Sequence, residues 1–171
     1  MPGPSQVALW QWSLLASLGR QAALWDTLST DEQARAERFH FPRDCRRYVV
    51  GRGTLRARLA AYLGCPTAAV ALSCNEFSKP ALQDPYWHAQ LSFNLSHSDE
   101  MAVGAELSHP PGSFAVSVHP ALPARLLRID GDPAEIAHWT LAALSVSPGY
   151  AAAIALRQPD CTFAWRAAMR S

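Results

Sequence analysis

The chain has 171 residues, of which 49% are hydrophobic, and its 15 basic and 14 acidic residues leave a net charge of +1. This length suits one ordinary domain, which buries roughly 70% of its unfolded surface when it folds compactly. The sequence shows no signal-peptide pattern and no apolar run long enough to span a membrane. We therefore expect a cytoplasmic protein without a membrane partner.

The four cysteines point to the same compartment. They are Cys45, Cys65, Cys74 and Cys161, and no two of them form a Cys-x-x-Cys pair. Their spacings suit neither a zinc site nor a disulfide framework. We expect reduced and mostly buried thiols, as in a cytosolic protein.

The basic residues are unevenly distributed. All are arginines except Lys79, and eight arginines fall within residues 35–58 beside only two acidic residues. Such a patch suits a phosphorylated ligand, an acidic protein or nucleic acid. We do not expect nucleic acid as a partner, because few aromatic residues accompany the arginines and no nucleic-acid-binding motif is present.

The first half of the chain predicts two helices. Ser29, followed by acidic residues that suit the positive end of a helix dipole, predicts a helix that runs to about His40. Apolar residues then recur at helical spacing and predict a longer helix over residues 43–63. Gly51 and Gly53 lie inside this second helix. Since each costs roughly 1 kcal/mol there, they indicate a close approach of another group.

Most other elements are predicted to be strands, because β-branched, aromatic and small apolar residues alternate with polar turns. These strands are expected at residues 7–15, 70–74, 91–95, 101–107, 113–119, 126–129, 137–146 and 150–156, with a loop at residues 80–85. The fold class is therefore α+β, and residues 1–107 and 108–171 form two unequal halves of one unit.

One predicted strand is followed by Ser96, His97 and Ser98. At the edge of a sheet, two hydroxyl groups and an imidazole that can be charged near neutral pH can bind a phosphate. The same residues also suit an ordinary turn, so the cluster alone leaves both interpretations open.

Four motifs follow one another in a fixed order. They are A-R-A-E-R-F at residues 34–39, D-C-R-R-Y-V-V-G-R-G-T-L-R at 44–56, S-K-P at 78–80 and F-N-L-S-H-S at 93–98. In this order they resemble the 4′-phosphopantetheinyl transferases of the surfactin-synthetase-activating type, in which the third motif is usually Gly-Lys-Pro. The resemblance covers residues 1 to about 107, and the tail resembles only the family's last strands.

The resemblance implies a pseudo-twofold fold, of which this chain holds the N-terminal half and a truncated second half. It implies transfer of the phosphopantetheine arm of coenzyme A to a serine of an acyl or peptidyl carrier protein. The implied coenzyme A site has Arg35 and Arg47 at the 3′-phosphate, and Lys79, Pro80, Ser96 and His97 around the adenine and phosphates. Arginine suits phosphate because its guanidinium is a charged fork of donors. The other arginines are expected at the surface.

The segment that supplies the family's metal site and base has no counterpart in this sequence. The resemblance places a Gly-(Ile/Val)-Asp-(Ile/Val)-Glu segment with two Mg²⁺ ligands after residues 101–106, and later a Trp-x-x-Lys-Glu motif with a catalytic lysine. The chain contains no Asp-x-Glu, and Lys79 is its only lysine. An internal deletion near residues 106–108 explains this. It leaves Glu106 as a lone candidate Mg²⁺ ligand, which would hold the ion weakly, and no catalytic residue.

Two other acidic pairs are weaker substitutes for the metal ligands. Asp99 and Glu100 are adjacent and are expected to point to different sides of a strand. Asp130 and Asp132 lie in a turn that follows a different strand.

We therefore expect a family member with impaired transfer activity. The alternative is a non-catalytic module that binds coenzyme A or a carrier protein, for example as one part of a split enzyme. Apolar strands left uncovered by the absent helices would favour oligomers.

Overall fold

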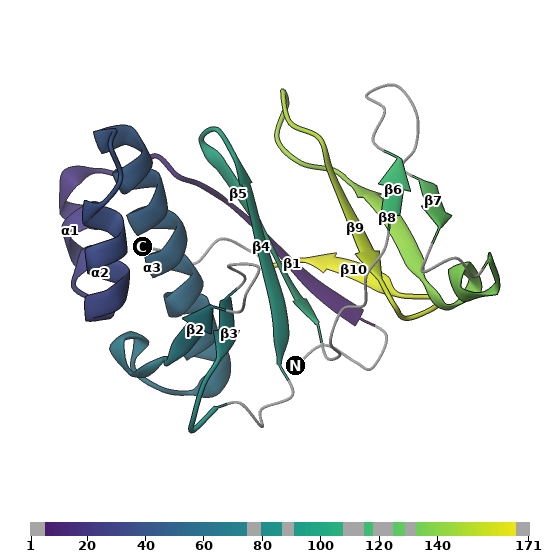
Figure 1. Cartoon of the computed structure of the whole chain (residues 1–171), viewed down its shortest axis with the longest axis horizontal. Helices are drawn as coiled ribbons and strands as arrows, with labels where there is room; N and C mark the ends of the chain where they lie inside the picture. The colour runs from purple at the N-terminus through teal and green to yellow at the C-terminus, as the bar shows by residue number, and fades with distance from the viewer. Residues whose placement is uncertain are drawn as a thin grey trace.

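The computed structural model describes residues 6–74, 80–86, 91–107, 115–117, 125–128 and 133–166. Over these ranges the chain has a mixed α/β architecture (Figure 1). The helices are α1 (Leu18–Trp25), α2 (Thr30–Glu37) and α3 (Pro42–Leu63), with 3-10 helices η1 (Thr67–Ala69) and η3 (Pro133–His138). The strands are β1 (Gln6–Ser13), β2 (Leu72–Cys74), β3 (Pro80–Leu82), β4 (Ser92–Ser98), β5 (Met101–Leu107), β6 (Ala115–Ser117), β7 (Arg125–Arg128), β8 (Thr140–Leu144), β9 (Ala152–Leu156) and β10 (Thr162–Trp165). None of these helices is long and apolar enough to cross a membrane.

Side-chain caps define where the first two helices begin. Ser17 accepts a hydrogen bond from the first turn of α1, and Ser29 forms a reciprocal capping box with Glu32 in α2. Each cap satisfies backbone N–H groups that have no partner within the helix, and such a cap contributes about 1 kcal/mol. The start predicted at Ser29 is confirmed, although α2 ends at Glu37 rather than at His40. Helix α1 was not predicted.

Helix α3 is the longest helix and packs closely on α1. Its bounds confirm the helix predicted over residues 43–63, and Gly64 ends it with a φ of 64°, a left-handed conformation that suits glycine. A Cβ added at Gly53 would stand only 2.8 Å from the Cβ of Leu24 in α1. The glycine therefore permits the close approach that its presence inside a helix predicted.

The largest sheet has the strand order β10-β1-β5-β4. The pairs β1–β5 and β5–β4 are antiparallel, whereas β1 and β10 are parallel, with Gln6 opposite Thr162. Strand β4 is therefore an edge strand, and it continues to Ser98, beyond the predicted end at residue 95. Strand β10 was not predicted, and it ties the tail to the first strand of the chain.

Three antiparallel pairs, β2–β3, β6–β7 and β8–β9, make up the remaining sheets. The prediction of a loop at residues 80–85 was wrong for its first three residues, which pair as β3 with β2. The strand predicted to start at residue 137 begins only at Thr140, because η3 ends at His138. These differences lie at short elements, whose few residues show little periodicity.

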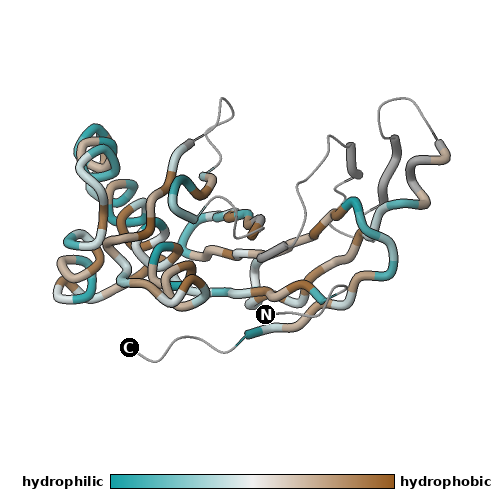
Figure 2. Tube along the Cα trace, turned by 90° about the horizontal axis from the view of Figure 1, so that it is seen from below, coloured by the Kyte–Doolittle hydropathy of each residue, from teal (hydrophilic) through white to brown (hydrophobic). Residues whose placement is uncertain are grey.

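The large sheet is covered on both faces. The three helices lie on one side of it, and the β8–β9 hairpin lies on the other (Figure 1). On the hairpin side, Val7 and Leu9 of β1 form a buried cluster with Ile154 and Leu156 of β9. Figure 2 shows hydrophobic residues along the strands in the middle of the molecule and hydrophilic residues along the outer helical turns. The sheet thus fixes the position of residues on its edge strand β4 through pairing with β5 and through packing.

The described cysteines form no disulfide. Cys45, Cys65 and Cys161 are free thiols, and each is half-buried, where the sequence predicted mostly buried thiols. The side chain of Cys74 lies outside the described residues.

Candidate functional site

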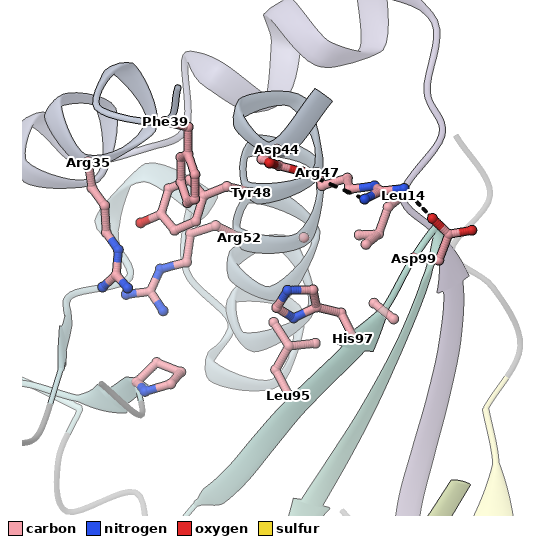
Figure 3. Close-up of a pocket in the computed structure, with 13 residues that line it drawn as sticks. Leu14, Arg35, Phe39, Asp44, Arg47, Tyr48, Arg52, Leu95, His97 and Asp99 are labelled. Carbon is pink, nitrogen blue, oxygen red and sulfur yellow. Dashed lines mark hydrogen bonds and ion pairs between the residues drawn. The ribbon is translucent and has the colours of Figure 1, made fainter. Parts of the chain in front are cut away.

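A cavity of about 580 Å³ lies between helices α2 and α3 and the edge strand β4. This volume is within the range of roughly 300–1,000 Å³ typical of small-molecule sites. In Figure 3, Arg35 of α2, Arg52 of α3 and His97 of β4 point into the same space. The lining residues are Leu14, Arg35, Phe39, Asp44, Arg47, Tyr48, Gly51, Arg52, Pro80, Leu95, His97, Asp99 and Ala102.

Four of the residues predicted for coenzyme A binding share this cavity. They are Arg35, Arg47, Pro80 and His97, which come from α2, α3, β3 and β4 respectively. Helices α2 and α3 place the two arginines at different ends of the cavity, since Arg47 points toward Asp99 of the β4–β5 turn, and β4 places the imidazole between them (Figure 3). The cavity thus combines cationic donors from separate elements.

Ser96 lies elsewhere, because successive side chains of a strand point to opposite faces. Leu95 and the turn residue Asp99 line the main cavity with His97. Ser96 and Ser98 instead line a second cavity of about 210 Å³ beside the β8–β9 hairpin, which His97 also borders. The structure therefore does not bring Ser96 together with the arginines.

The other predicted site residues are placed only partly. Lys79, Asp130 and Asp132 lie outside the described residues. The backbone of Glu106 lies in β5, opposite Ala8 of β1 and Phe93 of β4, and its side chain is outside the described set.

Arg47 is surrounded by carboxylates. Its Nη2 donates a hydrogen bond to Asp99 Oδ1 and another, at 2.8 Å, to Glu100 Oε1, while its Nη1 lies 3.7 Å from Asp44 Oδ1. The hydrogen bond to Glu100 raises the pKa of Arg47 above its ordinary value, so the guanidinium stays charged. The expectation that Asp99 and Glu100 point apart was wrong. They form the β4–β5 turn, where Asp99 has a φ of 47°, and strand alternation does not apply.

Aromatic rings form another part of the cavity wall. The guanidinium carbon of Arg35 lies 5.7 Å from the ring centroid of Tyr48, whose ring lies 5.5 Å from that of Phe39. Aromatic faces beside a cation can accept a flat ring that carries anionic groups. The sequence did not single out Phe39 and Tyr48 as site residues. Both lie inside the first two motifs of the resemblance, which is the signal that could have found them.

Buried ion pairs hold α3 to α2 beneath the cavity. Glu32 accepts hydrogen bonds from Arg52 Nε and, at 2.8 Å, from Arg56 Nη1, and all three side chains are buried. Arg56 also donates to the carbonyl oxygen of Ala68 at 3.1 Å. The expectation that arginines other than Arg35 and Arg47 lie at the surface was wrong for these two. The sequence shows the charges but not the buried carboxylate that pairs with them.

Arg58 is buried as well, and it faces aromatic rings. Its guanidinium carbon lies 5.4 Å from the ring centroid of Trp10 and 5.8 Å from that of Trp12. Burial lowers the pKa of Arg58 below its ordinary value. In the described part of the chain it has no carboxylate partner, so cation–π contacts fix this part of α3 on β1.

The described residues do not fit a magnesium site. They include no group of three or more histidine, cysteine, aspartate or glutamate side chains that could hold a metal ion. Asp44 and Asp99, which line the cavity, both face the guanidinium of Arg47. Mg²⁺ prefers an octahedral set of oxygen ligands, which these residues do not form.

All residues that line the main cavity fall within a segment that matches a known family. The model of the N-terminal part of 4′-phosphopantetheinyl transferase matches residues 12–109. The chain belongs to the 4′-phosphopantetheinyl transferase family. The resemblance found in the four sequence motifs is thereby confirmed.

A curated relative supports the same family assignment. The 4′-phosphopantetheinyl transferase HetI of Nostoc sp. (strain PCC 7120) is 42% identical to the chain over 100 residues. The match covers 58% of this chain and 42% of HetI, so the chain spans less than half the length of this relative.

Proposed function

We propose that the cavity between α3 and β4 is the coenzyme A site of a 4′-phosphopantetheinyl transferase. In the reaction of this family, the phosphopantetheine arm of coenzyme A passes to a serine of an acyl or peptidyl carrier protein. The observation that carries the proposal is the convergence of Arg35, Arg47 and His97 on one cavity inside the family-matched residues. The cytoplasm as the location and the division at residues 107/108 remain predictions.

The lining residues suit the parts of coenzyme A. Arg35 and Arg47 offer charged donors to the 3′-phosphate, and each such hydrogen bond contributes about 1.5–3 kcal/mol. His97 offers a further donor to phosphate from the opposite wall. The rings of Phe39 and Tyr48 provide a surface for the adenine. Pro80 starts β3 and positions the end of the S-K-P motif at the cavity.

We further propose that transfer is impaired in this chain. Attack by a serine hydroxyl needs a group that accepts its proton, and the pyrophosphate needs its charge neutralised. The sequence has no Asp-x-Glu, and its only lysine is Lys79. The residues around the cavity bind and orient, but none of them is assigned as the base.

The cavity lined by Arg35, Arg47 and His97, together with the absence of an Asp-x-Glu motif, also supports an alternative function. A chain with the binding residues and without the acidic pair would act as a non-catalytic module, binding coenzyme A or a carrier protein as one part of a split enzyme. Transfer that appears only after a fragment with the absent motifs is added would favour this alternative.

Titration calorimetry with coenzyme A tests the binding proposal. We expect saturable binding that Arg47→Ala weakens by roughly tenfold or more, since a charge-assisted hydrogen bond is lost. Arg20→Ala is the matched control, because Arg20 is exposed on α1 and does not line the cavity. Equal losses in both variants would contradict the proposed site.

A transfer assay tests the proposal of impaired activity. The chain is incubated with coenzyme A, Mg²⁺ and an apo carrier protein, and the mass of the carrier protein is followed. We expect no mass increase at a rate typical of an intact family member. Rapid conversion to the holo form would contradict impaired activity.

A further inference from the structure

Two of the three carboxylates around Arg47, those of Asp99 and Glu100, come from a segment far along the chain, whereas Asp44 lies on the same helix. We propose that Asp99 and Glu100 act as a built-in anionic latch, which occupies Arg47 and competes with a phosphate group for it. This inference rests on the proposed coenzyme A site and adds a regulation of that site. The latch sets how tightly an anion binds, because a phosphate must displace the two carboxylates before it reaches the guanidinium.

A backbone hydrogen bond fixes the turn that carries the latch residues Asp99 and Glu100. The carbonyl oxygen of Glu100 accepts a hydrogen bond at 2.7 Å from the N–H of Leu14, which follows β1. The side chain of Asp99, by contrast, is 68% exposed, while that of Arg47 is 15% exposed. The backbone therefore holds the turn in place, and the exposed carboxylate of Asp99 can swing away without unfolding it, whereas the side chain of Glu100 is more enclosed, at 25% exposed.

The contact between the latch and Arg47 is incomplete. Both carboxylates bind the same nitrogen, Nη2. Arg47 Nε and Glu100 Oε2 are buried and have no hydrogen-bond partner in the described structure. A bidentate ligand uses two neighbouring nitrogens of the guanidinium fork, as phosphate commonly does. An entering phosphate can thus satisfy a donor that the latch leaves unused.

The latch disfavours simple anions more than it disfavours coenzyme A. Displacing it lowers the affinity of every anion that uses Arg47 by the same factor. A ligand with many other contacts, such as coenzyme A, still binds after this loss. A small anion that depends on Arg47 alone loses the same factor and has no other contacts that offset the loss.

Neutral variants of the latch provide the test. Asp99→Asn and Glu100→Gln keep the side-chain shape and remove the charge. We expect each variant to bind coenzyme A about two- to five-fold more tightly than the parent chain, because a carboxylate that solvent partly screens no longer competes for Arg47. Binding of dephospho-coenzyme A, which lacks the 3′-phosphate, should not change. In an Arg47→Ala background, Asp99→Asn should leave the affinity for coenzyme A unchanged, because this double-mutant cycle isolates the interaction between Arg47 and Asp99.

Asp160→Asn is the matched control. Asp160 also lies in a turn with positive φ, at 55°, and its replacement changes the net charge equally. It does not line the cavity, so we expect it to leave the affinity for coenzyme A unchanged.

The other outcomes overturn the latch in distinguishable ways. If Arg47→Ala weakens coenzyme A binding while the two neutral variants leave it unchanged or weaken it, the latch is wrong and the proposed site stands. If the tightening persists without Arg47, a general charge effect replaces the latch. If no variant binds coenzyme A, even with the latch removed, both the latch and the proposed function fail.

Discussion

Arg52 Nε donates a hydrogen bond to Glu32 Oε1, which joins the wall of the main cavity to the first turn of α2. The same carboxylate binds Arg56 at 2.8 Å and closes the capping box with the N–H of Ser29 at 2.9 Å. One buried side chain therefore sets both the start of α2 and the orientation of α3. The position of the cavity depends on it.

We expect Glu32→Gln to lower the free energy of unfolding by about 3–5 kcal/mol, because it leaves two buried guanidinium groups without a counter-charge. Urea denaturation followed by circular dichroism measures this loss. Glu37→Gln, at the exposed end of the same helix, is the control and should change stability by less than about 0.5 kcal/mol. Equal effects of the two changes would contradict the role of Glu32.

Two glycines in helices should respond in opposite directions to alanine. Gly53→Ala places a Cβ at 2.8 Å from the Cβ of Leu24, and we expect a loss of about 1–3 kcal/mol from this overpacking. At Gly19 in α1 the added Cβ meets nothing within 4 Å, so Gly19→Ala should stabilise the protein by up to about 1 kcal/mol. Thermal unfolding compares the two variants. If Gly53→Ala left the stability unchanged, α1 and α3 would not pack as described.

The helices with local signals could be predicted from the sequence, whereas elements held by distant contacts could not. The Ser29 cap and the long apolar repeat of α3 act within a few residues of their own position. Helix α1 has only eight residues, and its packing against Gly53 is visible only in the folded chain. Strand β10 pairs in parallel with β1 from the other end of the chain, and no local pattern encodes this pairing.

The candidate site could be predicted in part for the same reason. Family-like motifs singled out Arg35, Arg47 and His97, which the fold brings to one cavity. Strand alternation separates Ser96 from His97, because β4 extends to Ser98. The carboxylates that engage Arg47 and Arg52 could not be foreseen, because ion pairs depend on tertiary structure.

Substitutions of His97 and of Ser96, which are adjacent on β4, should differ in their effect on coenzyme A binding. His97→Ala removes a donor from the main cavity, and we expect coenzyme A to bind roughly tenfold more weakly. Ser96→Ala removes a hydroxyl from the second cavity and should change the affinity by less than about twofold. Titration calorimetry of both variants provides the comparison. A larger loss for Ser96→Ala would place the ligand on the opposite face of the strand.

The thiol of Cys161 should react slowly at mildly alkaline pH. Burial raises its pKa above its ordinary value, and only the thiolate reacts with iodoacetamide. Timed alkylation followed by peptide mass spectrometry should give a midpoint at higher pH than that of a free thiol. The raised pKa means that the thiol of Cys161 binds its proton more tightly in the folded state than in the unfolded state. The protonated thiol therefore contributes fully to the free energy of unfolding below the unfolded pKa of about 8.5. This contribution to stability is lost as the pH rises through the higher pKa of Cys161 in the folded state. A midpoint at or below that of a free thiol would contradict the burial of Cys161.

The central claim is that this chain keeps a coenzyme A site without the family's acidic metal ligands. Titration calorimetry of coenzyme A into the full chain, once with Mg²⁺ and once with a chelator, tests it most directly. We expect saturable binding of equal affinity in both solutions. Binding that strengthens with Mg²⁺ would reveal a metal site that the described residues do not form, and the absence of binding in both solutions would contradict the coenzyme A site itself.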